Sequence, residues 1–129
     1  MKKRIITTLL CVVMVLGLLT IPASARWTNC ASISLGMSRT NGTISWSGNI
    51  VGYSDTIEIT ADYVLEKLGS NGKYTLVDSW TGLSTTRTSL NSSDSAPNTS
   101  SGTYRLSLSG TVKSAGYTEP ITASITKTF

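Results

Sequence analysis

The sequence predicts an all-β fold, a single antiparallel β-sandwich of about seven strands. Three observations carry this prediction. Apolar and polar residues alternate at period two along most of the chain, which is the pattern of half-buried strands. Short runs of Gly, Asn, Asp and Ser separate these segments, as turns do. No segment after residue 25 has a convincing helical period.

The first residues predict a secretory signal peptide. Residues 1–4 are Met-Lys-Lys-Arg, residues 5–21 form an almost uninterrupted apolar run, and residues 23–25 are Ala-Ser-Ala, a small-x-small cleavage site. We therefore expect a signal peptide at 1–25, a mature domain at 26–129, secretion, and no membrane contact after cleavage. An uncleaved anchor is the alternative, although the apolar run is just short of the ~20 residues that a spanning helix needs.

Removal of the signal changes the charge and the cysteine count. Three of the eleven basic residues leave with it, so eight basic residues face seven acidic ones, a net charge of +1. Because the mature part has no Lys/Arg cluster, we expect no nucleic-acid partner. Cys11 also leaves, so Cys30 cannot form an intramolecular disulfide. We expect Cys30 to be buried as a small hydrophobe in a monomer, with an intermolecular thiol as the alternative.

The first two strands are predicted over residues 30–38 and 43–51. In the first, one face carries Ala31, Ile33, Leu35 and Met37, and the other carries serines and Gly36. In the second, Ile44, Trp46 and Ile50 share a face. The turn signal Asn41-Gly42 stands between the two strands.

A hairpin over residues 56–80 is the centre of the predicted fold. Its first half places Ile57, Ile59, Ala61, Tyr63 and Leu65 on alternate positions. A helix is the rival there, because several apolar residues also share a helical face and Gly69 could follow its last turn. The β-branched and aromatic residues and the turn at 69–72 favour strands. In the second half, over 74–80, Asp78 shares the parity of the large apolar residues, which indicates a bulge or an edge strand.

The rest of the chain predicts three more strands. Thr81-Gly82 is expected to turn into a weak strand at 84–90, followed by one long loop at 91–102. The sixth strand is the cleanest, with Tyr104, Leu106, Leu108, Gly110 and Val112 on alternate positions. Ala115-Gly116-Tyr117 then connects to the seventh strand, where Ile121, Ala123 and Ile125 alternate with polar residues.

The segment Ser100-Ser101-Gly102-Thr103-Tyr104-Arg105-Leu106 resembles the tyrosine corner of immunoglobulin-like domains. Tyr104 lies two residues before a core position, Leu106, at which antibodies have a cysteine. The resemblance implies an immunoglobulin-like sandwich that lacks the disulfide. It also implies that the Tyr104 hydroxyl donates to a backbone carbonyl in the preceding loop.

The mature chain is also similar to a group of small single-domain proteins secreted by Gram-positive bacteria, with an immunoglobulin-like or fibronectin-III-like strand pattern. The residues that carry this likeness are Val51-Gly52-Tyr53-Ser54, Tyr63-Val64-Leu65-Glu66-Lys67, Trp80, Gly102-Thr103-Tyr104-Arg105 and Ala115-Gly116-Tyr117. The resemblance implies the fold and no activity.

Catalytic chemistry has few candidates in this chain. The absence of histidine removes the usual general base, the commonest metal ligand and every Ser-His or Cys-His arrangement. Ser70 and Lys73 match the Ser-x-x-Lys motif of penicillin-binding enzymes, but the two further motifs are absent and a hairpin turn is expected there. The sequence therefore predicts no enzyme, no catalytic residue and no cofactor.

The acidic residues were the remaining candidates for an acid/base pair or a metal. Glu58, Asp62 and Glu66 lie four residues apart, or about 13 Å on a strand, which is too far for a glycosidase pair. They are interpreted as a solvated face. Asp94 and Asn98 could form a weak Ca²⁺ loop but lack the spaced carboxylates of calcium sites, so a plain loop and no metal are expected.

The aromatic residues near loops are the candidates for recognition. Tyr53 and Tyr117 are placed where exposed rings could stack on sugars or anchor a partner. The alternative is that these rings only cover the edges of the core. The predicted function is a secreted, extracellular, non-catalytic binding module for an unknown protein or glycan. A small secreted effector, inhibitor or antagonistic protein is the alternative.

Overall fold

The computed structural model describes residues 27–129, so the predicted signal peptide at 1–25 lies outside the described residues. The described part consists of seven β-strands joined by short connections and contains no helix. The strands are β1 (Cys30–Thr40), β2 (Thr43–Gly52), β3 (Thr56–Leu68), β4 (Tyr74–Thr85), β5 (Ser89–Ala96), β6 (Thr103–Ser114) and β7 (Tyr117–Thr128).

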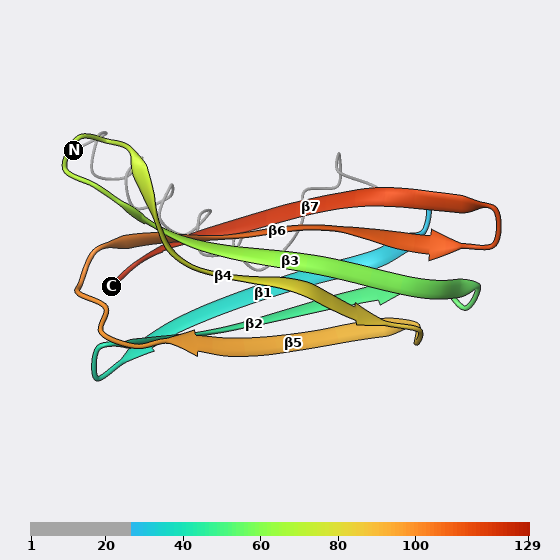
Figure 1. Ribbon diagram of the computed structural model, residues 1–129, viewed down its shortest axis with the longest axis horizontal. Coiled ribbons are helices and arrows are strands. Elements are labelled where there is room, and N and C mark those ends of the chain that lie inside the picture. The colour runs from blue at the N-terminus through green and yellow to red at the C-terminus, as the bar shows by residue number, and fades with distance from the viewer. Residues whose placement is uncertain (1–26) are drawn as a thin grey trace, which may run out of the picture.

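The strands form two sheets that lie one over the other (Figure 1). The smaller sheet has three strands in the order β1-β2-β5, and the larger has four in the order β4-β3-β6-β7. Every pairing is antiparallel. The predicted all-β, seven-stranded antiparallel sandwich is therefore confirmed.

The core fills the space between the two sheets, because the inward residues of each strand are apolar. Its largest fully buried side chains are Tyr63, Tyr104, Ile44, Ile50, Ile59, Leu65, Leu106, Leu108, Ile121 and Val112. The Trp46 ring stacks at 4.3 Å from Tyr63 and 5.0 Å from Trp80, measured between ring centroids. Such tilted aromatic pairs add to the stability that area burial supplies.

The central hairpin is confirmed as two strands, and the helical alternative is wrong. β3 pairs with β4 on one side and β6 on the other, so its backbone groups are satisfied by neighbouring strands. Residues 69–73 form the turn, in which the Gly69 N–H donates to the Lys73 carbonyl at 2.8 Å. The Ser-x-x-Lys segment lies in this turn, as expected. β4 is an edge strand with register shifts against β3, as its pattern indicated.

The facing of two residues was predicted wrongly because each lies at a bulge. Register shifts occur between Cys30 and Ser32, and between Thr56 and Glu58. One extra residue reverses the parity of what lies beyond it. As a result Ala31 is exposed while Cys30 is buried, and Ile57 is exposed while Thr56 is buried. The predicted burial of Cys30 is confirmed.

The chain between residues 81 and 102 also differs from the prediction. β4 continues through Thr81-Gly82 to Thr85, so no turn occurs there and no separate strand runs over 84–90. Gly82 is at φ 74°, a conformation that favours glycine, and its N–H donates to Asp62 Oδ1 at 2.8 Å. Strand β4 therefore continues past the irregular backbone conformation at Gly82. β5 then occupies the first half of the segment predicted as a loop.

One end of the sandwich contains the hydrogen bond that was expected for the Tyr104 hydroxyl. Tyr104 is 1% exposed, and its hydroxyl donates to the Ser100 carbonyl at 2.7 Å. Gly102 and Phe129 exchange two backbone hydrogen bonds of 2.9 and 2.8 Å, so the last residue is fixed against the start of β6. The Lys67 ammonium lies over the Tyr104 ring and bonds to Ser100. We call this the corner end; it also holds the β1–β2 and β3–β4 turns (Figure 1).

Candidate functional site

Three exposed apolar side chains lie at the opposite end of the sandwich. Tyr53, Ile57 and Tyr117 are 49%, 47% and 53% exposed. They are three of the five large hydrophobic residues that are exposed among residues 27–129; the other two, Leu76 and Val77, lie on the edge strand β4. We call these three residues the end patch. The prediction that the Tyr53 and Tyr117 rings are exposed near loops agrees with this geometry.

The three residues belong to neighbouring segments of the larger sheet and its connection to β2. The Thr56 N–H donates to the Tyr53 carbonyl at 3.0 Å, which closes the β2–β3 connection. Thr56 pairs with Ser114 on β6, and Ser114 pairs with Tyr117 on β7. Adjacent strands are about 4.8 Å apart, so the backbone around the patch spans roughly 10 Å. Figure 1 shows the β2–β3 and β6–β7 connections at the same end of the molecule.

A buried carboxylate fixes the Tyr117 side of the patch. Glu119 is 7% exposed and accepts the backbone N–H groups of Thr28 and Asn29 at 2.7 and 2.8 Å. The Asn29 side-chain amide donates in turn to the carbonyls of Val112 and Tyr117, both at 3.2 Å. Hydrogen bonds to a charged group are among the stronger ones in proteins. The start of β7 is therefore tied to the segment that precedes β1.

Close backbone packing fixes the Tyr53 side. The Gly52 N–H donates to the Thr88 carbonyl at 2.7 Å. A Cβ added at Gly52 would lie 2.1 Å from Thr56 Oγ1, so only glycine fits between this connection and the first residue of β3. The rings of the end patch are thus exposed on a backbone that is held in place on both sides.

The arrangement can bind a partner through aromatic and aliphatic contacts. Tyrosine rings offer a large apolar face and a hydroxyl that both donates and accepts. Asp55 in the β2–β3 connection and the cross-strand pair Glu58 and Lys113 add charges of both signs nearby. Ile57 was missed as a member of this site. Nothing in the sequence marks the bulge that turns it outward, and simple alternation assigns it to the core.

The carboxylates considered as an acid/base set do different things in the structure. Glu66 Oε1 forms an ion pair with Arg105 at 2.9 Å, Asp62 accepts the Gly82 N–H, and Glu58 is exposed. Asp94 lies on strand β5, where its carboxylate accepts the Ser95 N–H at 2.8 Å. It is therefore not part of a loop with Asn98, as a calcium-binding loop would require. Within residues 27–129, no group of three or more acidic, cysteine or histidine residues could hold a metal ion.

Two buried groups have raised pKa values. Burial raises the pKa of the Cys30 thiol to about 11; a hydrogen bond to the Ser32 carbonyl offsets part of the rise and the charge of Glu119 adds to it. Burial raises the pKa of Tyr63 to about 12. Ser92 offsets part of that rise, although its contact with the Tyr63 hydroxyl does not reach hydrogen-bond geometry. Both groups therefore stay protonated at neutral pH, and the thiol is a poor nucleophile.

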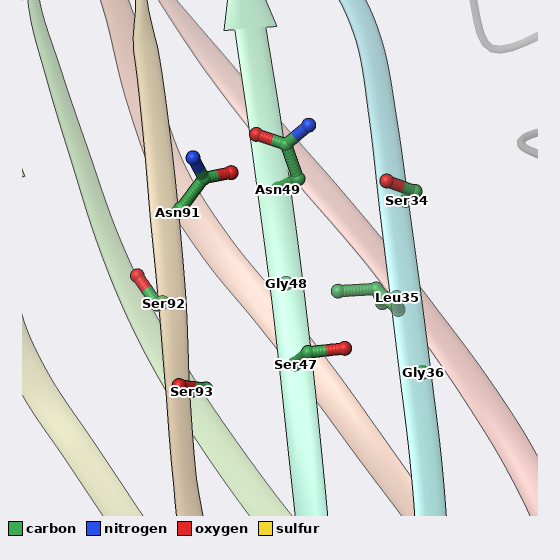
Figure 2. A pocket seen from close by; sticks show the side chains of 9 residues that line it. All are labelled: Ser34, Leu35, Gly36, Ser47, Gly48, Asn49, Asn91, Ser92 and Ser93. Atoms are coloured by element: carbon green, nitrogen blue, oxygen red, sulfur yellow. The ribbon is translucent and has the colours of Figure 1, made fainter.

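The outer face of the smaller sheet is polar and uncharged. A shallow hollow of about 440 Å³ lies over the middle of β1, β2 and β5. Figure 2 shows Asn49 between Ser34 and Asn91, and Ser47 and Ser93 on the next row. These hydroxyls and amides can exchange hydrogen bonds with water or a ligand, but no aromatic or charged side chain lines the hollow.

Comparison with solved structures shows a likeness in fold. No family model and no curated protein matches the chain. The fold is similar to the crystal structure of wild-type OgpA from the bacterium Akkermansia muciniphila, with 13% sequence identity and a TM-score of 0.45. The match covers 84% of this chain and 30% of that one, so the chain spans about a third of the length of the protein that it matches. In the part of the chain from residue 27 onward, no helix is long and apolar enough to cross a membrane.

Proposed function

We propose that the mature chain is a secreted bacterial binding module that attaches to a protein or glycan through the end patch and catalyses no reaction. The observation that carries this proposal is the exposure of three large apolar side chains at one end of a fixed backbone. Exposed aromatic residues on rigid scaffolds are frequent anchors of binding interfaces, whereas scattered single apolar residues need no explanation. Connections at the end of a sandwich are also where recognition is usually located.

The proposal includes an immunoglobulin-like relationship. The hydrogen bond from Tyr104 to the Ser100 carbonyl supports it, as does the division of seven strands into sheets of three and four. The constant-type immunoglobulin domain places its fourth strand in the sheet of the first strand. Here β4 pairs with β3 in the other sheet, so the proposed relationship is to sandwiches in which that strand has changed sheets.

A non-catalytic role is supported by how the potential chemical groups are used. The Cys30 thiol is buried with a raised pKa, Glu66 is paired with Arg105, and Asp62 accepts a backbone N–H. Catalysis at neutral pH needs an activated nucleophile or a group that titrates near pH 7. Hydrolysis or transfer by the purified mature chain, lost on Glu58→Gln or Ser70→Ala, would contradict the proposal.

The binding test uses fluorescently labelled mature protein on whole bacterial cells, isolated peptidoglycan and a glycan panel. The double variant Tyr53→Ala/Tyr117→Ala should lose at least tenfold in affinity for whatever surface the unchanged protein binds. The matched control is Leu76→Ala/Val77→Ala, which removes exposed apolar side chains from β4 and should bind normally. Equal attachment of both double variants would show that the end patch is not the contact. Growth inhibition of neighbouring cells without attachment would favour a secreted effector instead.

Processing is tested separately by intact-mass analysis of protein from the culture fluid. The Ala-Ser-Ala site predicts a species that begins at Arg26. A secreted species that retains residues 1–25, or protein found only in the cell membrane, would contradict the predicted cleavage.

A further inference from the structure

A second concave site lies along the side of the sandwich, between the free edges of β4 and β5. The two strands belong to different sheets, and within residues 27–129 each is an edge strand of its sheet (Figure 1). A cleft of about 340 Å³, which we call the edge cleft, lies between them. Residues that line it include Trp46, Trp80, Leu83, Asn91, Ser93 and Asp94.

The inner part of the edge cleft is aromatic and contains a donor without a partner. Trp46 is 2% exposed, and its Nε1–H finds no acceptor among residues 27–129. A buried donor of this kind is rare in folded proteins and needs a physical explanation. Trp80 packs against Trp46 at 5.0 Å and is itself only partly buried, so part of its ring lines the cleft.

The rim supplies hydrogen-bonding groups with little charge. Asp94 on β5 is exposed and presents a carboxylate, while Asn91 and Ser93 lie on the part of the rim that also borders the hollow on the outer face. Asp94 on β5 is the direct cross-strand partner of Trp46 on β2. The carboxylate and the buried indole are therefore side chains of paired residues on neighbouring strands. No lysine or arginine lines the cleft.

We propose that the edge cleft binds one ring of a neutral saccharide. The apolar face of a sugar packs on the Trp80 ring, and its hydroxyls bond to Asp94. The buried Trp46 indole lies behind Trp80 as part of the cleft wall and makes no direct bond to the sugar. The volume is at the lower end of the range for small-molecule sites, which fits a single ring better than an extended ligand. This site is separate from the end patch and does not depend on the function proposed for it.

Two other occupants fit the edge cleft less well. An anionic ligand would meet the Asp94 carboxylate with no basic side chain to offset the repulsion. A strand added to the free edge of β5 would bury that carboxylate, because Asp94 has the parity of the inward residues Leu90 and Ala96. Inward-pointing charges on edge strands are a recognised obstacle to such pairing.

The test is a titration of ¹⁵N-labelled mature protein followed through the tryptophan indole N–H resonances. Single Trp→Phe variants assign the three indole signals. Cellopentaose, chitopentaose, maltopentaose and mannopentaose are added up to about 10 mM, enough to approach saturation for a Kd of about 1 mM. At least one sugar should shift the Trp46 and Trp80 signals with a saturable profile, while the Trp27 signal stays in place. Absence of a saturable shift with all four sugars would overturn the proposal.

Variants separate specific binding from a general effect. Asp94→Ala should weaken the sugar at least tenfold. The control is Asp78→Ala, because Asp78 makes the same local bond to the next residue's N–H at 2.8 Å but does not line the cleft. Unweakened binding by Asp94→Ala would contradict the assigned site, as would concentration-dependent broadening of β5 amides, which indicates a strand partner. The Tyr53→Ala/Tyr117→Ala variant should keep the indole shifts even where it no longer attaches to cells.

Discussion

The two ends of the sandwich treat their aromatic residues in opposite ways. At the corner end the Tyr104 ring is covered, its hydroxyl is bonded to Ser100, and Lys67 lies over its face. The Phe129 ring packs near it at 6.1 Å between centroids. These contacts close that end. The end patch, in contrast, leaves its two tyrosine rings about half exposed.

The difference does not come from a looser chain at the end patch. Hydrogen bonds from the Asn29 amide and the Gly52 N–H and to the Glu119 carboxylate hold its backbone, just as the bonds between Gly102 and Phe129 hold the other end. Exposure on a fixed backbone limits the entropy that a partner must overcome on binding. Covered aromatic residues therefore contribute to stability at one end of the sandwich, and exposed ones are available for contact with a partner at the other.

The largest expected effect comes from the carboxylate beneath the end patch. Glu119→Ala removes the acceptor of two backbone N–H groups, at least one of them buried, and should lower the free energy of unfolding by about 3 kcal/mol. Urea denaturation measures the loss. Glu58→Ala, an exposed acidic residue on the same sheet, is the control and should stay within about 0.5 kcal/mol. If the two variants lose the same free energy of unfolding, Glu119 does not hold the backbone next to the end patch.

The next effect is a loss of stability at alkaline pH. Because the folded pKa of Cys30 is raised from 9.0 to about 11, the unfolded chain releases its thiol proton first. The stabilisation is complete below pH 9 and is lost as the pH rises to about 11, with an expected size of about 2 kcal/mol. Denaturation midpoints of the unchanged protein and Cys30→Ala across this range measure the difference. An identical alkaline slope in both proteins would contradict a buried thiol with a raised pKa.

A smaller effect distinguishes two buried tyrosines. Tyr104→Phe removes the bond to the Ser100 carbonyl and should cost about 1 kcal/mol. Tyr63→Phe should cost nothing or stabilise the protein slightly, because the buried Tyr63 hydroxyl has no hydrogen-bond partner among residues 27–129. Thermal or urea unfolding of the two variants decides the point. If both lose the same amount, the corner bond contributes nothing specific.

The smallest effect on stability is expected at the end patch itself. Tyr53→Ala and Tyr117→Ala should each change the free energy of unfolding by less than about 0.5 kcal/mol, since both rings are half exposed. Circular dichroism and urea unfolding provide the measurement. A loss of several kcal/mol would assign these rings to the core and leave the proposed function without its main support.

Much of the fold could be predicted from the sequence because most strands have one clearly apolar face. β2, β3 and β6 each bury several large side chains at period two, and that pattern has few alternatives. The fifth strand was placed too early, at 84–90, because β5 buries only Leu90 and Ala96, near its two ends, with polar residues between them. Its strand conformation comes from pairing with β2, a long-range interaction that local patterns do not contain.

The candidate sites could be predicted only in part. Tyr53 and Tyr117 were chosen because they lie near predicted loops, where exposed rings could contact a sugar or a partner. Ile57 was not, because a bulge reverses its facing. The edge cleft is lined by Trp46, Trp80 and Asp94, which lie on three strands of two different sheets. These residues become neighbours only because the chain crosses from one sheet to the other, which local sequence patterns do not reveal.

The position of the first and last strands has a mechanical consequence. β1 begins at the end of the sandwich that carries the end patch, and β7 ends at the corner end (Figure 1). A force that pulls residues 27 and 129 apart therefore pulls both strands along their own axes. The β6–β7 ladder runs from Thr103 and Thr128 to Ser114 and Tyr117 without a register shift. When β7 is pulled along its own axis, all the backbone hydrogen bonds of the β6–β7 ladder carry the force together. When a strand is instead peeled away from its neighbour, these hydrogen bonds break one after another. The domain should therefore resist stretching along the chain better than its modest size suggests.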